Sequence, residues 1–225
     1  MMQWEEYIRA MTDRLRSVFG ERLCYVGLQG SHLRGEATEG SDLDLMVVIE
    51  GLTPHDLEDY RACLSSLGSD IPSCGFLCGR EELSCWNPLE IAHLRHSTKD
   101  IWGSLAPLLP QVTRDEHRRY VQLSLGNLYH ALCHRYVHTP HENSRAKLGR
   151  HEKELFFLLQ DLHYLRTGVF APTRAALYDA LAPGERAVWD AVKAARDAAD
   201  TYDFDAAFSA VFAWCKDVMR EIAQF

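Results

Sequence analysis

The chain has 225 residues, 47% of them hydrophobic and 25% charged, and its 24 Lys and Arg against 32 Asp and Glu leave a formal net charge of −8. This acidic balance argues against a broad nucleic-acid surface, because nucleic-acid binders neutralise phosphates with clustered Lys and Arg. No apolar run approaches the roughly 20 residues that a membrane helix needs, so no membrane partner is expected. The seven cysteines form no disulfide-like framework, which indicates reduced thiols and a cytoplasmic protein.

The first half of the chain alternates between helical and extended patterns. Trp4, Ile8 and Met11 recur at helical spacing, and Thr53 followed by Pro54 predicts the capped start of a second helix. The predicted helices cover residues 3–19, 53–67 and 81–96, the last broken around Pro88, and the predicted strands cover 23–28, 43–49, 74–79 and 98–102. This alternation predicts a small mixed α/β domain.

The second half contains helical patterns without strand signals. Two prolines in the segment 106–111, APLLPQ, mark the predicted domain boundary. The predicted helices beyond it cover residues 113–138, 143–167, 173–182, 184–200 and 204–222. The sequence therefore predicts an α+β protein, with a small mixed-sheet domain at residues 1–110 followed by an all-helical bundle domain at 111–225.

Residues 24–50, CYVGLQGSHLRGEATEGSDLDLMVVIE, carry the most specific chemical pattern. Two hydrophobic strands flank a glycine-rich loop, and Asp42 and Asp44 open the second strand. Residues two apart on a strand project to the same face, so these carboxylates point the same way and repel each other. A divalent cation would neutralise both, and oxygen-only ligands suit Mg²⁺. The alternative is an ordinary strand-entry turn, which Ser-Asp pairs also form.

A Gly-Ser turn precedes the two aspartates. Gly30 lets a phosphate approach the backbone closely, and Ser31 adds a hydroxyl and an N–H donor. Arg34 either contacts a nucleotide phosphate or orders the loop, and Ser41 either contacts the nucleotide or stabilises the turn. Metal-binding carboxylates that face a Gly-Ser turn indicate a site for a nucleoside triphosphate.

The pattern G-S-x-x-R-G-x-A-x-x-x-S-D-x-D-L, from Gly30 to Leu45, resembles the signature of the DNA polymerase β-like nucleotidyltransferase superfamily. It is similar to the bacterial small-molecule and minimal members, and the two-domain layout is similar to that of the kanamycin nucleotidyltransferases. The resemblance implies an enzyme that moves a nucleoside monophosphate, AMP from ATP, to a hydroxyl group and releases pyrophosphate. It also implies that Asp42 and Asp44 are catalytic and bind one or two Mg²⁺ ions.

The sequence departs from the family at one point. The family usually places a third carboxylate on a later strand, and in the predicted strand CGFLCG the residue near that place is Gly75. Four other acids are candidates, although each also fits a surface charge or a helix cap: Glu81, Glu82, Asp100 and Glu116. Either the helical domain supplies the base, as in the kanamycin nucleotidyltransferases, or catalysis is weak.

Basic residues of the helical half supply further candidates. The resemblance implies that a lysine from this half, Lys153 or Lys147, reaches the triphosphate. Arg145 and His151 fit the loose R-x(4–6)-H pattern of helical ribonuclease toxins that are paired with minimal nucleotidyltransferases. Both patterns also fit a solvated basic helix face.

Histidines and cysteines raise the question of a second metal site. His130, His134 and His138 lie on one helix face, where pairs of histidines can bind zinc, or where they form only a polar surface. Three cysteines of the first half lack the close pairs of a zinc site and are predicted to be buried thiols: Cys74, Cys78 and Cys85.

Three hypotheses about function follow. The first is an enzyme whose acceptor is a small molecule such as an aminoglycoside-like antibiotic, held between the two domains. The second is an antitoxin-type nucleotidyltransferase that modifies a Tyr or Ser hydroxyl of a partner protein. The third, which the missing carboxylate favours, is a degenerate module that binds a nucleoside triphosphate without turning it over.

Overall fold

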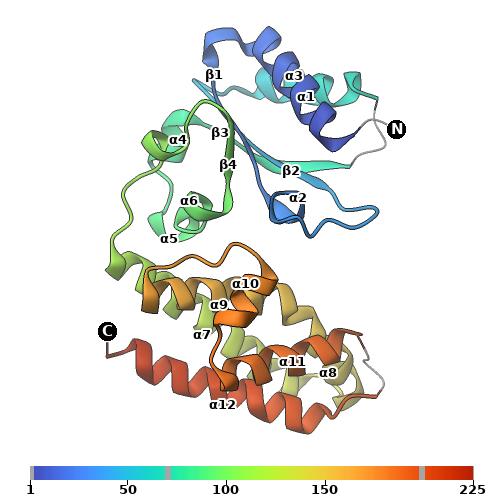
Figure 1. The fold of residues 1–225 in the computed structure, drawn as a ribbon, viewed down its shortest axis with the longest axis vertical. Coiled ribbons are helices and arrows are strands. Elements are labelled where there is room, and N and C mark those ends of the chain that lie inside the picture. The colour runs from blue at the N-terminus through green and yellow to red at the C-terminus, as the bar shows by residue number, and fades with distance from the viewer. Residues whose placement is uncertain (1–2, 69–71, 198–200, 225) are drawn as a thin grey trace. The chain divides into compact units, whose positions relative to one another are not determined.

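A mixed four-stranded sheet forms the centre of the first half of the chain in the computed structural model, which describes residues 3–68, 72–197 and 201–224 (Figure 1). The strands are β1 (Leu23–Leu28), β2 (Leu43–Ile49), β3 (Ser73–Gly79) and β4 (Lys99–Trp102), and their order is β3-β2-β1-β4. β1 runs antiparallel to β2 and β4, whereas β2 and β3 are parallel. β2 is therefore an inner strand with a neighbour on each side.

Hydrophobic cores cover both faces of this sheet. Alternate residues of β2 project to opposite faces, so Leu43 and Leu45 join one core while Met46 and Val48 join the other. The first core is completed by helices α1 (Trp4–Phe19) and α3 (Pro54–Ser66). The second is completed by the segment of short helices α4 (Arg80–Ser84), α5 (Pro88–Ile91) and α6 (Leu94–Ser97).

The start of α3 is joined to the start of β1 through Asp56. The Asp56 carboxylate accepts hydrogen bonds from the backbone N–H and the hydroxyl of Thr53, both at 2.8 Å, which completes a capping box at the predicted start of this helix. The same buried carboxylate forms an ion pair with Arg22. Burial alone would raise the pKa of Asp56, but the hydrogen bonds from Thr53 and the charge of Arg22 outweigh it, so the pKa is lowered.

In the second half of the chain, the regular structure of the described residues consists of helices joined by short loops, without strands (Figure 1). Its helices are α7 (Arg114–His138), α8 (His141–Leu148), α9 (Glu152–Thr167), α10 (Arg174–Ala180), α11 (Pro183–Asp197) and α12 (Phe204–Ile222). Buried apolar residues from all six helices form one hydrophobic core. In the described part of the chain, no helix is both long enough and apolar enough to cross a membrane.

The α+β fold class predicted from the sequence is confirmed, with the sheet in the first half and the helices in the second. The chain divides into two compact units, Met1–Gln111 and Val112–Phe225. The assignment of residues 1–110 and 111–225 as two separate domains stays a prediction.

Three predicted elements differ from the structure in detail. The turn after β1 begins with a short helix, α2 (Gly30–Arg34), and the predicted helix at 81–96 is divided into α4, α5 and α6. The predicted helix at 143–167 is interrupted by a 3-10 turn at Gly149–His151. This turn lies against α11 so closely that a Cβ on Gly149 would be 2.4 Å from the Arg196 backbone nitrogen.

We expect the replacement Asp56→Asn to remove a pH-dependent part of the stability. Because the pKa of Asp56 is lowered in the folded protein, its ionised form stabilises the fold above the unfolded-state pKa of a carboxyl group. This contribution is lost as the pH falls through the lowered pKa, so the wild type should lose its advantage over the variant in acid. Urea unfolding midpoints measured across acidic and neutral pH test this.

The matched control for this prediction is Glu116→Gln. Glu116 occupies the same capping-box position on α7, where its carboxylate accepts a hydrogen bond from the Thr113 backbone N–H. It is less buried than Asp56. Its variant should show the smaller pH-dependent difference. Equal pH dependence in the two variants would contradict the role assigned to the Arg22 pair.

Candidate active site

Asp42 and Asp44 lie at the start of β2, with Asp42 just before the strand and Asp44 its second residue. Their intervening and following neighbours, Leu43 and Leu45, are fully buried in the core beneath α1 and α3. The two carboxylates therefore project to the opposite face of the sheet, as the alternation of the sequence predicts. Asp42 is exposed and Asp44 half-buried, so water and ligands can reach both.

The pairing of β2 with β3 brings a third side chain to the same place. Asp44 is the register partner of Cys74, and partners on neighbouring strands project to the same face. One carboxylate oxygen of each aspartate and the Cys74 sulfur all lie within 4.8 Å of one another. Among the described residues, no other group of three or more acidic, histidine or cysteine side chains converges in this way.

Gly75, the residue that lies near the place of the family's third carboxylate in the sequence, does not share the face of the two aspartates. Gly75 pairs with Leu45, which belongs to the buried face, so a side chain at position 75 would point into the core. The prediction that Cys74 and Cys85 are buried was wrong, because both are exposed; Cys78 is buried as predicted. The strand register that brings Cys74 to the aspartates is a tertiary feature without a signal in the local sequence.

Gly30 packs directly against the Asp44 carboxylate. Its φ is +70°, and a Cβ at this position would lie 1.8 Å from Asp44 Oδ2. The backbone N–H of Gln29, just before it, donates a hydrogen bond of 2.9 Å to the Asp44 carbonyl oxygen. The predicted Gly-Ser turn, now seen as the start of α2, is thereby held beside the aspartates, with Ser31 as its second residue.

Two other predicted nucleotide contacts have partners within the loop. Arg34 forms an ion pair with Glu36, with 2.9 Å between Arg34 Nε and Glu36 Oε2. Ser41 Oγ accepts a hydrogen bond of 2.9 Å from the backbone N–H of Thr38. These contacts order the loop between α2 and β2. Nucleotide binding by Arg34 and Ser41 stays a prediction.

The alternative acids have structural contacts of their own. Asp100 Oδ1 accepts hydrogen bonds from the Tyr25 hydroxyl at 2.7 Å and from the Leu105 N–H at 3.3 Å. Burial, together with this carboxylate, raises the pKa of Tyr25. Glu116 caps α7, and Glu82 packs beside Gly79. The convergent set of ligand atoms at the aspartates includes none of these three acids.

The arrangement at the aspartates fits a divalent cation. Two unit charges no more than 4.8 Å apart repel each other by at least about 1 kcal/mol in water and at least about 3 kcal/mol at an effective dielectric constant of about 20. A cation between them turns this repulsion into attraction. Both carboxylates offer oxygen ligands, and their exposure leaves room for water or phosphate oxygens to complete the coordination.

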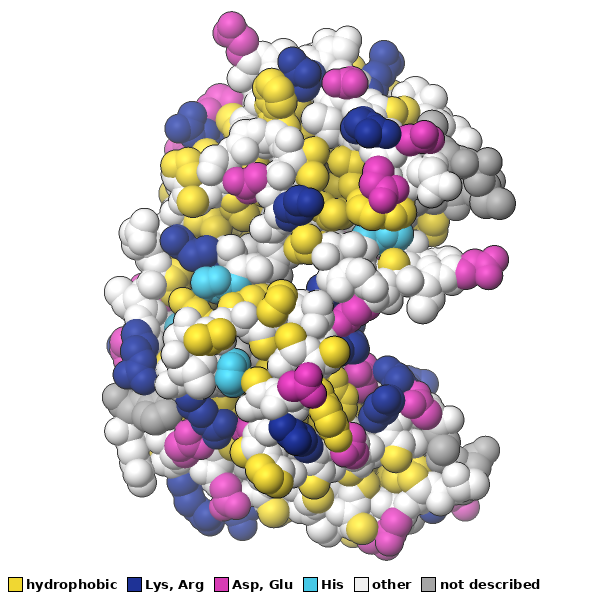
Figure 2. Space-filling model, viewed as in Figure 1, with side chains coloured by type: hydrophobic (Ala, Val, Ile, Leu, Met, Phe, Trp, Pro, Cys, Tyr) yellow, Lys and Arg dark blue, Asp and Glu magenta, His cyan; other side chains and the backbone are white. Residues whose placement is uncertain are grey.

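The candidates in the helical unit are placed as follows. Lys153 is an exposed residue of α9, and its contact with nucleotide stays a prediction. His130, His134 and His138 are exposed on α7, with successive ring centroids 5.9 Å and 4.8 Å apart. On the face shown in Figure 2, acidic and basic side chains are interspersed over both units.

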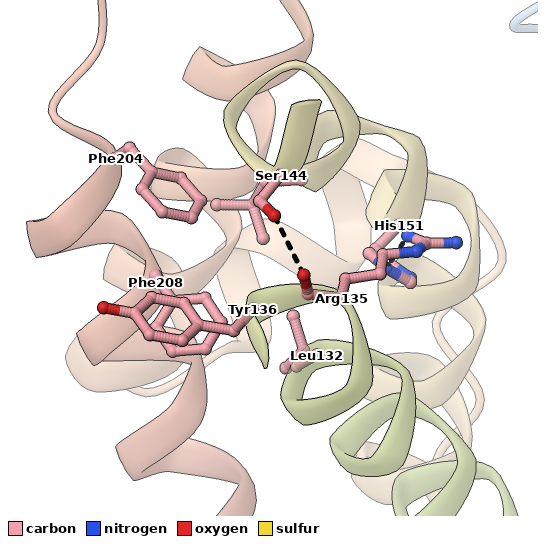
Figure 3. Close-up of a pocket in the computed structure, with 8 residues that line it drawn as sticks. Leu132, Arg135, Tyr136, Ser144, His151, Phe204 and Phe208 are labelled. Carbon is pink, nitrogen blue, oxygen red and sulfur yellow. Dashed lines mark hydrogen bonds between the residues drawn. The ribbon is translucent and has the colours of Figure 1, made fainter. Parts of the chain in front are cut away.

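The predicted Arg145–His151 pair is separated by its packing contacts. Arg145 donates a hydrogen bond of 2.6 Å to the Tyr202 carbonyl oxygen and lies over the Tyr202 ring. His151 lies against Arg135 and Glu154, beside a cavity of about 10 Å³ between α7, α8 and α12 (Figure 3). A cavity of this size has room for about one water molecule, which is too small for a substrate.

Comparison with known proteins supports the same reading. Residues 14–74 match the family model described as a nucleotidyltransferase domain, and this range includes Gly30, both aspartates and Cys74. The fold is similar to the crystal structure of spectinomycin adenyltransferase AAD(9) from Enterococcus faecialis with ATP and spectinomycin. The TM-score is 0.58 at 15% identity, over 97% of this chain and 99% of that one. No curated protein matches the sequence.

We expect the double replacement Asp42→Asn/Asp44→Asn to weaken Mn²⁺ binding on the order of 100-fold, because it removes both charged ligands. Electron paramagnetic resonance of free Mn²⁺ measures this directly. The control is Glu39→Gln, which removes one exposed acidic charge from the same loop. Equal loss in the control would mean that general charge, and not the aspartate pair, holds the ion.

Proposed function

We propose that this chain, as a nucleotidyltransferase of the DNA polymerase β-like superfamily, moves AMP from ATP to a hydroxyl group of a small-molecule acceptor. The observation that supports this most strongly is the pair Asp42 and Asp44, which share one face of the sheet beside the Gly30–Ser31 turn. Both parts lie within the residues that match the family.

The residues of the site have distinct roles in this proposal. Asp42 and Asp44 hold Mg²⁺ through their carboxylate oxygens. Gly30 leaves room for a phosphate beside Asp44, and Ser31 donates its hydroxyl and N–H to phosphate oxygens. When bound, Mg²⁺ neutralises charge on the triphosphate and stabilises the pyrophosphate that leaves. Lys153 is proposed as a further triphosphate contact, and Arg34 and Ser41 as contacts that also order the loop.

The choice of ATP and of a small-molecule acceptor has separate support. One solved structure with a similar fold is an adenyltransferase that was crystallised with ATP and spectinomycin. The net charge of −8 suits a cationic, hydroxyl-rich acceptor such as an aminoglycoside-like antibiotic. We therefore place such antibiotics first among the acceptors to be tested, ahead of hydroxyl groups on a partner protein.

The first test is calorimetric titration with ATP, GTP, CTP and UTP, each with and without Mg²⁺. We expect ATP to bind more tightly than the other three nucleotides. We expect this binding to require Mg²⁺, because the ion held by the aspartates would also bind the phosphates. The Asp42→Asn/Asp44→Asn variant should lose this binding, whereas Glu39→Gln should keep it. Lys153→Ala should bind ATP about tenfold more weakly if its ammonium group meets a phosphate. Metal-independent binding that survives in the double variant would overturn the proposal.

The second test is pyrophosphate release in the presence of spectinomycin and a panel of aminoglycosides. Acceptor-dependent release by the wild type should fall about 1,000-fold or more in the double variant, because the charge that develops during transfer is no longer neutralised. Mass spectrometry of the acceptor should show the addition of one AMP. Metal-dependent ATP binding without release on any acceptor, including protein hydroxyls, would instead identify a nucleotide-binding module without turnover.

A further inference from the structure

We propose that Cys74 is a third ligand of the cation site, and that its sulfur lets Zn²⁺ compete there with Mg²⁺. The inference rests on the proposed function only in that Asp42 and Asp44 are taken as the other two ligands. It concerns which metal ion this particular site selects.

The geometry of the paired strands carries the inference. Cys74 and Asp44 are register partners on parallel strands, and Asp42 precedes Asp44 by two residues on the same face. The other residues of β3 on this face, Phe76 and Cys78, belong to the core that also contains Met46 and Val48 of β2. Cys74, near the start of β3, is the exposed residue of this face. Cys74 is therefore directed to the aspartates by the backbone register.

The distances fit a common ion. The three ligand atoms lie within 4.8 Å of one another. Around one tetrahedral Zn²⁺, with Zn–S of about 2.3 Å and Zn–O of about 2.0–2.2 Å, the ligand atoms would be roughly 3.3–3.8 Å apart. The ligand atoms would therefore have to approach one another by at most about 1.5 Å, which side-chain rotation can supply because Asp42 and Cys74 are exposed. Water or a phosphate oxygen can supply the fourth ligand.

The chemistry of the ligand set determines the selectivity. Mg²⁺ takes hard oxygen ligands in near-octahedral geometry and gains little from a thiolate. Zn²⁺ binds thiolate and carboxylate together in tetrahedral sites. A thiol at this place therefore moves the site from oxygen-only ligands to a set that Zn²⁺ and Co²⁺ prefer.

Two other accessible thiols in the first unit, Cys24 and Cys85, lack this arrangement. Cys24 lies near one acid only, with 3.8 Å between its sulfur and Glu50 Oε2, and Cys85 lies beside the Ser84 hydroxyl at 3.8 Å. Neither belongs to a convergent group of ligand atoms among the described residues. Cys85 is exposed like Cys74 and lies in the same unit, which makes Cys85→Ser the matched control.

The test is a titration of the reduced full-length chain with Co²⁺, whose bond to a thiolate gives a charge-transfer absorption in the near ultraviolet, followed by displacement with Zn²⁺. The wild type and Cys85→Ser should show the absorption, and Cys74→Ser should lose it. Zn²⁺ should bind Cys74→Ser about tenfold more weakly or worse, whereas Mn²⁺ binding should change little. Cys74→Asp should shift the preference from Zn²⁺ toward Mg²⁺. Circular dichroism checks that each variant is folded.

The outcomes separate this inference from the proposed function. If Mn²⁺ binding depends on Asp42 and Asp44 but Co²⁺ gives no thiolate absorption, the role of Cys74 is overturned and the proposed function stands. If the thiolate absorption persists unchanged in Asp42→Asn/Asp44→Asn, the sulfur binds the ion without the aspartates, and the three-ligand site is overturned. If the double variant also binds Mn²⁺ as well as the wild type, the proposed function fails with it.

Discussion

The pleat of β2, fixed by a neighbouring strand on each side, is the constraint on which the first unit depends. A residue on one face of this strand cannot move to the other without shifting the register of the whole sheet. Leu43 and Leu45 are held in the core beneath α1 and α3, so Asp42 and Asp44 are held outside it. The burial of the leucines therefore supplies the free energy that keeps two like charges close together.

The sequence predicts the features of this unit that depend on neighbours in the chain. Each strand is predicted to within one residue, as is the common face of Asp42 and Asp44, because period-two alternation is a local property. Cys74 was missed because its contact with Asp44 depends on how two strands 30 residues apart are aligned. A shift of one residue in that alignment would have placed Gly75 there, which is the position that spacing along the chain suggested.

In the helical unit the sequence indicated more chemistry than the structure brings together. Arg145 and His151 are residue types found in active sites, but here each is engaged in packing, Arg145 with Tyr202 and His151 with Glu154. The interruption at Gly149 had no local signal either, because it arises from the close approach of a separate helix, α11. Charged side chains in a helical bundle often join helices, and sequence spacing alone does not distinguish that role from catalysis.

The contact between Gly30 and Asp44 has a consequence for how such a site is mapped. The Asp44 carboxylate can lie against the backbone here because Gly30 has no Cβ atom. A survey that truncates side chains measures what each existing group contributes, so it has nothing to remove at position 30. The smallest change available there adds a methyl group, and the deficit it causes combines intrusion into the space of the Asp44 carboxylate with the strain of a side chain at a φ of +70°. The contribution of the contact between Gly30 and Asp44 can therefore be measured only by placing a larger residue at position 30.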